Sequence, residues 1–293
     1  MLWLFRFLSV WPLSVLHALG GLLGWGVWAF SPAYRLRFRS NSAQAGVPFD
    51  VARPAIAEAG RFAAELPRLW LRPYAESCLG NVHIEGMELA HQAFACGSGV
   101  IFFGPHCGSF ELGPQALAEV FGPQYGSVTA IYRPARQAWL AEIEIAVRQR
   151  PYLAVLPASV GTIKAMHKAL RAGRATALLT DQVPPDGLGI WAPFFGKSAY
   201  TMTLAARLAM QSGAVLMPVS CERLPGGRGY IVKIHPAVNL PANPDLPGVV
   251  TCINQSIENI VLSQPGQYLW GYGRYKAPRQ EIAPEHSAHK GKS

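Results

Sequence analysis

Short apolar runs recur through the C-terminal two thirds of the chain, each bounded by glycine, proline or polar residues. They are GVIFFGP (99–105), GSVTAIY (126–132), PYLAVLP (151–157), ATALLT (175–180), AVLMPVS (214–220) and GYIVKIHPAV (229–238). Apolar runs of this length are typical of strands buried on both faces of a parallel sheet. We interpret all six as strands.

Helical patterns, with apolar residues three and four positions apart, separate several of these runs. They are ARQAWLAEIEIAVRQ (135–149), SVGTIKAMHKALRAG (159–173), YTMTLAARLAMQSG (200–213) and VVTCINQSIENIVLSQ (249–264). Strands that alternate with helices in this way form βαβ units. The pattern therefore predicts an α/β fold with a mainly parallel sheet flanked by helices.

The region before the first strand, residues 35 to about 98, has a helical pattern throughout. One helix is expected within residues 49–70, and another within residues 86–99, ending at Gly97 or Gly99. After Lys276 the chain becomes polar, which is typical of a loose tail. These shifts predict a membrane anchor at 1–34, an α/β domain at 35–280 and a flexible tail at 281–293.

The N-terminal segment has no Asp, Glu, Lys or Arg from Phe7 to Tyr34, and about 20 apolar residues are enough to cross a bilayer. Three arginines follow in RLRFR (35–39), whereas Arg6 alone precedes the run. The positive-inside rule then places the remainder of the chain in the cytoplasm. A cleaved signal peptide and a helix lying in one leaflet stay open as alternatives.

Composition narrows the class of protein. Charged residues make up 15% of the chain, against about 25% in ordinary soluble domains, and the net charge is +9. A basic excess suits nucleic acid, an anionic membrane or an acidic protein partner. No zinc-finger or RNA-binding motif accompanies the charge, so we expect no nucleic-acid partner. The five scattered cysteines indicate reduced thiols in a cytosolic compartment.

The stretch GPHCGSFELG (104–113) carries the first candidate chemistry. His106 would lie in the loop just past a strand end, where α/β proteins bind ligands. With a helix starting near Ser109, His106 can fold back toward Glu111, whose carboxylate would orient the imidazole as a general base. A solvated structural histidine, or Cys107 as a nucleophile with His106 as its base, are the alternatives.

Other polar residues follow other predicted strands. Arg133 comes directly after one, and Asp181 and Gln182 come after another, before a loop that ends in FFG. Because the carboxyl ends of parallel strands meet at one edge, these residues outline a single cleft. Candidate apolar walls, of which at least two are expected to be core residues instead, are Phe102, Phe103, Phe194 and Phe195.

These motifs together resemble the late, or secondary, acyltransferases of lipid A biosynthesis, which include lauroyl and myristoyl acyltransferases. That family carries H-x-x-x-x-[DE], a Y-R-P segment, D-Q or D-H before F-F-G, and Q-Y-x-W before R-[FY]-K. The matching residues here are His106, Glu111, Tyr132, Arg133, Pro134, Asp181, Gln182, Phe194, Phe195, Gly196, Gln267, Tyr268, Trp270, Arg274, Tyr275 and Lys276. One departure is Gly271–Tyr272–Gly273, where some members carry a histidine.

The resemblance implies a glycerolipid-acyltransferase-like fold with an N-terminal membrane helix. It implies an O-acyltransferase that moves a fatty acyl chain from acyl carrier protein to a hydroxyl of a lipid A precursor. The enzyme would sit in the inner membrane, single-pass or monotopic, with its catalytic domain facing the cytoplasm. No metal or other cofactor is expected, because the thioester is already activated.

The roles that follow are His106 as base, Glu111 as its orienting carboxylate, and Arg133 on a phosphate or the oxyanion. Asp181 is expected to order its loop or Arg133. Two other classes of function stay open: an acyltransferase or thioesterase acting on another membrane glycolipid or phospholipid, and a catalytically inactive lipid-binding protein anchored to the membrane.

Overall fold

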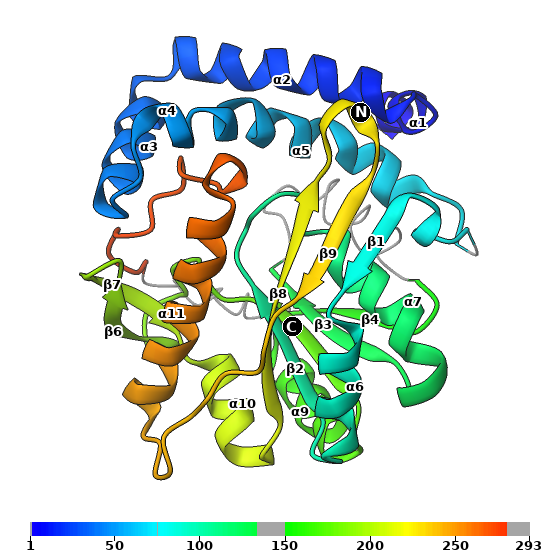
Figure 1. Ribbon diagram of the computed structural model, residues 1–293, viewed down its shortest axis with the longest axis vertical. Coiled ribbons are helices and arrows are strands. Elements are labelled where there is room, and N and C mark those ends of the chain that lie inside the picture. Colours follow the sequence, from blue (N-terminus) through cyan, green and yellow to red (C-terminus); the bar gives the residue numbers. More distant parts are fainter. Residues whose placement is uncertain (1, 75, 134–149, 280–293) are drawn as a thin grey trace, which may run out of the picture.

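A computed structural model describes residues 2–74, 76–133 and 150–279. Its central feature is a seven-stranded sheet in the order β1-β9-β8-β2-β5-β3-β4 (Figure 1). The strands are β1 (Val82–Glu85), β2 (Val100–Gly104), β3 (Val128–Tyr132), β4 (Leu153–Pro157), β5 (Ala175–Leu179), β8 (Val215–Arg223) and β9 (Tyr230–Ile234). All neighbours pair in parallel except β8 and β9. The predicted α/β class is therefore confirmed.

The two faces of the sheet are covered by different helices. Side chains alternate along β2, so that Val100 and Phe102 pack with α6 (Met87–Ala95) and α7 (Gly113–Tyr125). Ile101 and Phe103 pack on the other face with α9 (Val160–Arg171), α10 (Leu204–Ser212) and α11 (Leu246–Ser263). Phe102 and Phe103 are both 1% exposed, so both are core residues rather than channel walls.

Strand β8 leaves the parallel sheet halfway along its length. Its first half pairs with β2, ending at the register Phe103↔Pro218, and its second half pairs with β9 from Val219 to Arg223. Proline has no backbone N–H to donate, so a ladder readily changes partner there. The far end of β8 consequently rises toward α5 and α2, as Figure 1 shows.

Two features differ from the sequence-based expectation. The region before β2 is not wholly helical, because β1 lies within it and pairs with β9. The FFG loop is a hairpin of β6 (Gly189–Phe194) and β7 (Lys197–Met202), which extends into the stretch predicted as helical. Strand β1 is four residues long with no buried position, and β6 and β7 each include exposed positions, so none of the three has the continuous apolar pattern. The predicted helix at 135–149 and the tail lie outside the described residues.

The N-terminal part is a layer of helices over one end of the sheet: α1 (Leu2–Ser9), α2 (Leu13–Phe30), α3 (Pro32–Gln44), α4 (Phe49–Ala52) and α5 (Pro54–Leu71). Helix α2 runs along α5 (Figure 1). A Cβ at Gly24 would lie 2.1 Å from the carbonyl oxygen of Ile56, so the two backbones touch.

Helix α2 is the one described helix that is long and apolar enough to cross a membrane. Its 18 residues have a mean hydropathy of 1.5, and one third of them are buried against the protein. The opposite face is open to solvent: Leu22 is 70% exposed, Leu23 62% and Phe30 89%. The helix therefore has one face packed on α5 and one apolar face without a protein neighbour among the described residues.

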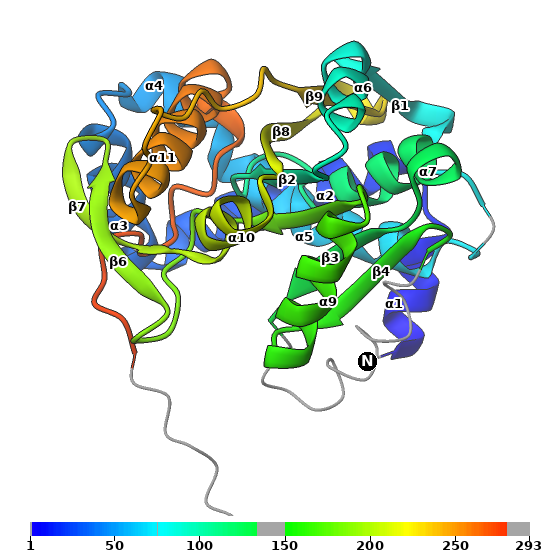
Figure 2. The same ribbon diagram turned by 90° about the horizontal axis from the view of Figure 1, so that it is seen from below.

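The C-terminal segment after α11 returns to the carboxyl edge of the sheet. It includes the 3-10 turn η3 (Pro265–Gln267) and the segment from Tyr268 to Lys276. Asn41 of α3 donates to the carbonyls of Trp270 (2.7 Å) and Tyr272 (2.6 Å), which fixes this segment against the N-terminal helices. Figure 2 shows α11 and the β6–β7 hairpin at one end of the molecule and α7 and β1 at the other.

Candidate active site

The loop between β2 and α7 carries His106. The chain does not enter a helix at Ser109 as the sequence predicts: residues 105–112 form bends, turns and isolated bridges at Cys107 and Gly108, and α7 begins at Gly113. Gly108 explains the extended turn, because its φ is +60° and a Cβ there would lie 2.0 Å from the carbonyl oxygen of Cys221. The loop therefore lies directly on the second half of β8, the part that pairs with β9.

Asp181 holds the imidazole of His106. The Nδ1 atom lies 2.6 Å from Asp181 Oδ1, and the backbone N–H of His106 donates to Oδ2 over 3.0 Å. The Asp181 side chain is 3% exposed, whereas that of His106 is 15% exposed. A carboxylate on Nδ1–H fixes the tautomer in which Nε2 carries the lone pair. Nε2 is then free to accept a proton from a substrate.

The register of the sheet explains why these two residues meet. Gly104 of β2 pairs with Leu179 of β5, and His106 and Asp181 each follow two residues later. Parallel strands in register end at the same height. The two side chains thus emerge side by side at the carboxyl edge, although 75 residues separate them in the sequence.

This geometry corrects the expected partner of His106. The sequence predicts Glu111 as the orienting carboxylate, whereas the carboxylate that accepts the described hydrogen bond from the imidazole is that of Asp181. The Trp70 indole N–H donates to Glu111 Oε2 over 3.3 Å, so Glu111 contacts α5. In the same turn, Phe110 packs edge-on against His106 with 4.6 Å between ring centroids.

Burial and charge act in opposite directions on Asp181. Burial raises its pKa, but the charge and hydrogen bonds of His106 outweigh burial, so the pKa lies below its usual value. The neighbouring Tyr268 is fully enclosed, and burial together with the Asp181 charge raises its pKa well above the usual range. A buried carboxylate that stays ionised can stabilise an imidazolium as it forms.

The histidine and carboxylate paired at the carboxyl edge of the sheet lie in a chain whose sequence matches a known protein family. Residues 2–277 match the family model described as bacterial lipid A biosynthesis acyltransferase. This match covers nearly the whole chain. The chain belongs to the bacterial lipid A biosynthesis acyltransferase family.

Individual relatives agree. The chain is 29% identical over 200 residues to the lipid A biosynthesis lauroyltransferase of Escherichia coli (strain K12), covering 68% of this chain and 63% of that protein. It is 27% identical to a lipid A biosynthesis acyltransferase of Haemophilus influenzae, covering 63% of this chain and 56% of that protein. It is 26% identical to a phosphatidylinositol mannoside acyltransferase of Mycobacterium tuberculosis, covering 59% of this chain and 52% of that protein. The matches thus span between about half and two thirds of these relatives.

The other residues that the family motifs single out are spread around the same edge. Arg133 follows β3 directly and is exposed. Gln182 follows Asp181 and is partly buried. Phe194 is 2% exposed, under the guanidinium of Arg274 at 4.7 Å, so it is a core residue, while Phe195 keeps part of its surface. The acyltransferase motifs therefore contribute both to the rim of the site and to its support.

The rival nucleophile does not fit the geometry of an acyltransferase site. Cys107 is 1% exposed, and burial followed by the Asp181 charge raises the pKa of its thiol well above the usual value. A thiol kept protonated and enclosed is a poor nucleophile. Its Sγ atom faces the carbonyl oxygen of Gln264 at 3.8 Å, as a weak donor.

The departure from the acyltransferase motif at residues 271–273 also has a structural account. A Cβ at Gly271 would lie 2.0 Å from the ring of Tyr34, so a glycine is required against α3. The Tyr272 hydroxyl accepts the backbone N–H of Val183 over 2.9 Å. Tyr272 thereby fixes the chain two residues beyond Asp181.

Proposed function

We propose that this protein is an O-acyltransferase that moves a fatty acyl chain from acyl carrier protein to a hydroxyl of a lipid A precursor. The observation that carries the proposal is the 2.6 Å contact between His106 Nδ1 and Asp181 Oδ1, in a chain of this family. A lipid-binding protein needs no oriented base, so this pair argues against a binder without catalysis.

His106 acts as general base in this mechanism. Nε2 takes the proton of the acceptor hydroxyl as the oxygen attacks the thioester carbonyl, and Asp181 stabilises the resulting imidazolium. Collapse of the tetrahedral intermediate breaks the C–S bond, and the imidazolium returns the proton to the leaving thiolate. The products are an ester and free thiol. A positioned base of this kind contributes roughly 10²- to 10⁴-fold to the rate.

Arg133 is the candidate group for an anionic part of the acceptor. It lies at the same edge as His106, because β3, like β2, is paired in parallel with β5. A guanidinium can hold a phosphate with two parallel hydrogen bonds, or stabilise the oxyanion. Arg133→Lys distinguishes these roles: loss of a phosphate contact raises KM for the acceptor, whereas loss of oxyanion stabilisation lowers kcat.

The cytoplasmic side of the inner membrane is the proposed place of reaction. The exposed face of α2 would enter the acyl layer, and Arg35, Arg37 and Arg39 follow that helix directly. The net charge of +9 suits both an anionic membrane surface and acyl carrier protein, which is acidic. The thioester supplies the activated carbonyl, so the proposed step uses no metal or other cofactor.

A second acceptor class is favoured by one observation. Phosphatidylinositol mannoside acyltransferases are among the relatives of this chain. Another membrane glycolipid with a free hydroxyl would be attacked through the same base. A thioesterase that uses water in place of the acceptor is the remaining alternative.

Product analysis of the purified full-length protein tests the proposal. Acyl-acyl carrier protein is supplied alone, with a lipid A precursor, or with a mannosylated phosphatidylinositol, and products are identified by mass spectrometry. We expect one added acyl mass on the lipid A precursor, absent in His106→Ala. Transfer to the mannolipid alone would correct the acceptor. Free fatty acid formed equally with and without acceptor would make the protein a thioesterase.

A further inference from the structure

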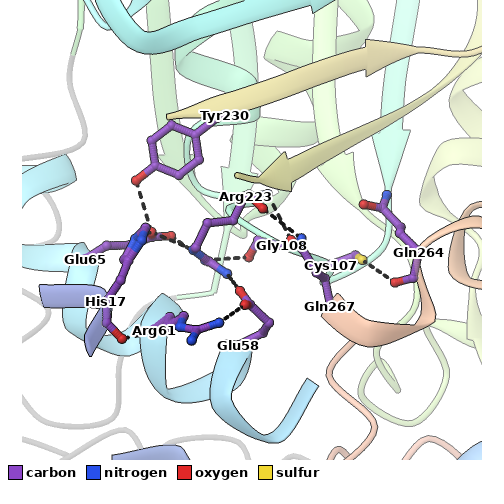
Figure 3. Close-up of polar contacts among 10 residues, drawn as sticks. All are labelled: His17, Glu58, Arg61, Glu65, Cys107, Gly108, Arg223, Tyr230, Gln264 and Gln267. Atoms are coloured by element: carbon purple, nitrogen blue, oxygen red, sulfur yellow. Dashed lines mark hydrogen bonds and ion pairs between the residues drawn. The ribbon is translucent and has the colours of Figure 1, made fainter. Parts of the chain in front are cut away.

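A second cluster of polar and charged side chains lies between α2, α5 and the β8–β9 hairpin, as Figure 3 shows. Its members are His17, Glu58, Arg61, Glu65, Arg223 and Tyr230. Arg223 is 3% exposed and Glu65 0%. Removing charges from water costs several kcal/mol per ion, and replacing such a pair by apolar residues is often neutral or stabilising. Stability alone therefore gives little reason for this pair.

Arg223 is the centre of the cluster. Its Nε and Nη2 atoms donate to the two oxygens of Glu65 over 2.8 and 2.6 Å, and Nη1 donates to Glu58 over 2.5 Å. Burial acts to raise the pKa of Glu65, but the hydrogen bonds and charge of Arg223 outweigh it, so the pKa is lowered. Arg223 is thus held rigidly against α5.

The guanidinium has one further hydrogen bond, and it leads to the loop of His106. Nη2 donates to the carbonyl oxygen of Gly108 over 3.1 Å. Gln267 supports the same connection. Its side-chain amide makes two 2.9 Å hydrogen bonds with the backbone of Arg223, one as acceptor and one as donor. The backbone carbonyl of Gln267 accepts the N–H of Gly108 over 3.1 Å. Both peptide groups of Gly108 are therefore held, two residues from His106.

We propose that Arg223 is a positioning residue for acyl transfer, which holds Gly108, and through it His106, at a fixed position relative to α5 and the carboxyl edge of the sheet. Asp181 fixes the imidazole from the β5 side, and Arg223 fixes the backbone from the β8 side. The inference rests on the proposed function, because His106 is the base there. A misplacement of about 1 Å can cost about 100-fold in rate.

Arg223→Lys is the first test, because lysine keeps the charge but is a point donor that cannot reach both carboxylates and Gly108. Glu65→Gln combined with Arg223→Gln is the second, because it removes the pair without leaving one buried charge alone. In both we expect kcat to fall about 10- to 100-fold, with KM for acceptor nearly unchanged. Hydrogen exchange of the 106–112 segment should accelerate.

Two control variants isolate positioning from stability. Val250→Ala, in the core on α11, destabilises the fold away from the cluster, and Lys233→Ala breaks an exposed 3.5 Å ion pair with Glu85. Neither should lower kcat per folded molecule. An equal kcat loss in Val250→Ala at matched melting temperature overturns the proposal, as do Arg223 variants with wild-type kcat or wild-type exchange at 106–112.

The exchange measurement also separates this inference from the proposed function. If the wild-type protein transfers no acyl group but the Arg223 variants still release the 106–112 segment, the proposed function fails and the positioning of the loop holds. If the protein is an active acyltransferase and the segment keeps its protection in both variants, the positioning role is excluded.

Discussion

At the scale of single residues, the site depends on which carboxylate meets His106. Asp181 does so because β2 and β5 are neighbours in register, and its own pKa is kept low by that histidine despite burial. Glu111 has the motif spacing but contacts Trp70 on α5. The chemistry therefore comes from a pair that is distant in sequence and adjacent in the sheet.

The first prediction concerns that pair. Asp181→Asn should lower kcat by about 100-fold or more with KM little changed, because Asn cannot stabilise the imidazolium as a carboxylate does. Added to His106→Ala, it should cause little further loss, since the two residues act as a unit. Asp186→Asn, on the exposed loop that follows, is the matched control. Steady-state kinetics of the two single variants, the double variant and the control measure these effects. If the kcat loss of the double variant equalled the product of the two single losses, the pairing would be excluded.

The second prediction concerns Gly108. Gly108→Ala should destabilise the protein well beyond the ~1–2 kcal/mol of left-handed strain, because the new Cβ would lie 2.0 Å from a carbonyl oxygen. Gly187→Ala should cost only that strain, because its φ is +79° and the space around it is open. Urea unfolding of both variants measures the difference. Equal costs would mean that the loop moves off β8 without penalty.

At the scale of elements, α2 is both a packed helix and an apolar surface. Close backbone contact and the 2.8 Å His17–Glu65 bond join it to α5, while Leu22 and Leu23 face outward. Separability of residues 1–34 from the α/β domain stays a prediction. The packing has a consequence for such a truncation: removal of α2 would expose Glu65 and the backbone of α5 around Ile56 and Gly60.

The third prediction tests the outward face of α2. Leu22→Ser should weaken binding to vesicles of anionic phospholipid about 10-fold, because burying a leucine side chain stabilises by about 1.5–3 kcal/mol. Val160→Ser on α9 is the control, since Val160 is 71% exposed and Leu22 70%. Sedimentation with vesicles measures both, with melting temperatures expected to stay unchanged. Equal weakening would show that α2 is not the face that meets lipid.

At the scale of the whole molecule, stability should depend on pH through His235, which joins β9 to β8. Its Nε2 lies 3.0 Å from the Ser220 hydroxyl. Burial and the Lys233 charge lower its pKa to about 4, and Glu85 offsets this only in part. In the unfolded chain the pKa of His235 is about 6.5, so between pH 4 and 6.5 this histidine binds more protons in the unfolded than in the folded state. The contribution of His235 to stability is therefore fully present above pH 6.5 and is lost as the pH falls toward 4.

The fourth prediction follows from that sign. His235→Gln should flatten the decline in unfolding free energy between pH 6.5 and 4, and His83→Gln, on the exposed face of β1, is its control. One histidine can change the unfolding free energy by at most about 1.4 kcal/mol per pH unit. The change is smaller here because His235 is partly exposed. Urea titrations across this range measure it. An unchanged slope in His235→Gln would remove this histidine from the acid response.

The amino-acid sequence by itself determined six strands of the central sheet, several of the described helices and the family. Buried parallel strands need continuous apolar runs, and the runs at 99–105 and 175–180 therefore became β2 and β5. The motif residues His106, Arg133 and Asp181 were found because polar residues follow such runs. Short or exposed strands, such as β1 and the β6–β7 hairpin, carry no such signal.

The tertiary structure decided everything that depends on strand order and on packing between distant segments. Local spacing favours Glu111 as the partner of His106, but the β2–β5 register brings Asp181 there instead. Arg223 ends an ordinary apolar strand, and nothing nearby in the sequence marks its contacts with α5 and Gly108. A hydrogen bond depends on distance in space, and that distance exists only after the sheet has formed.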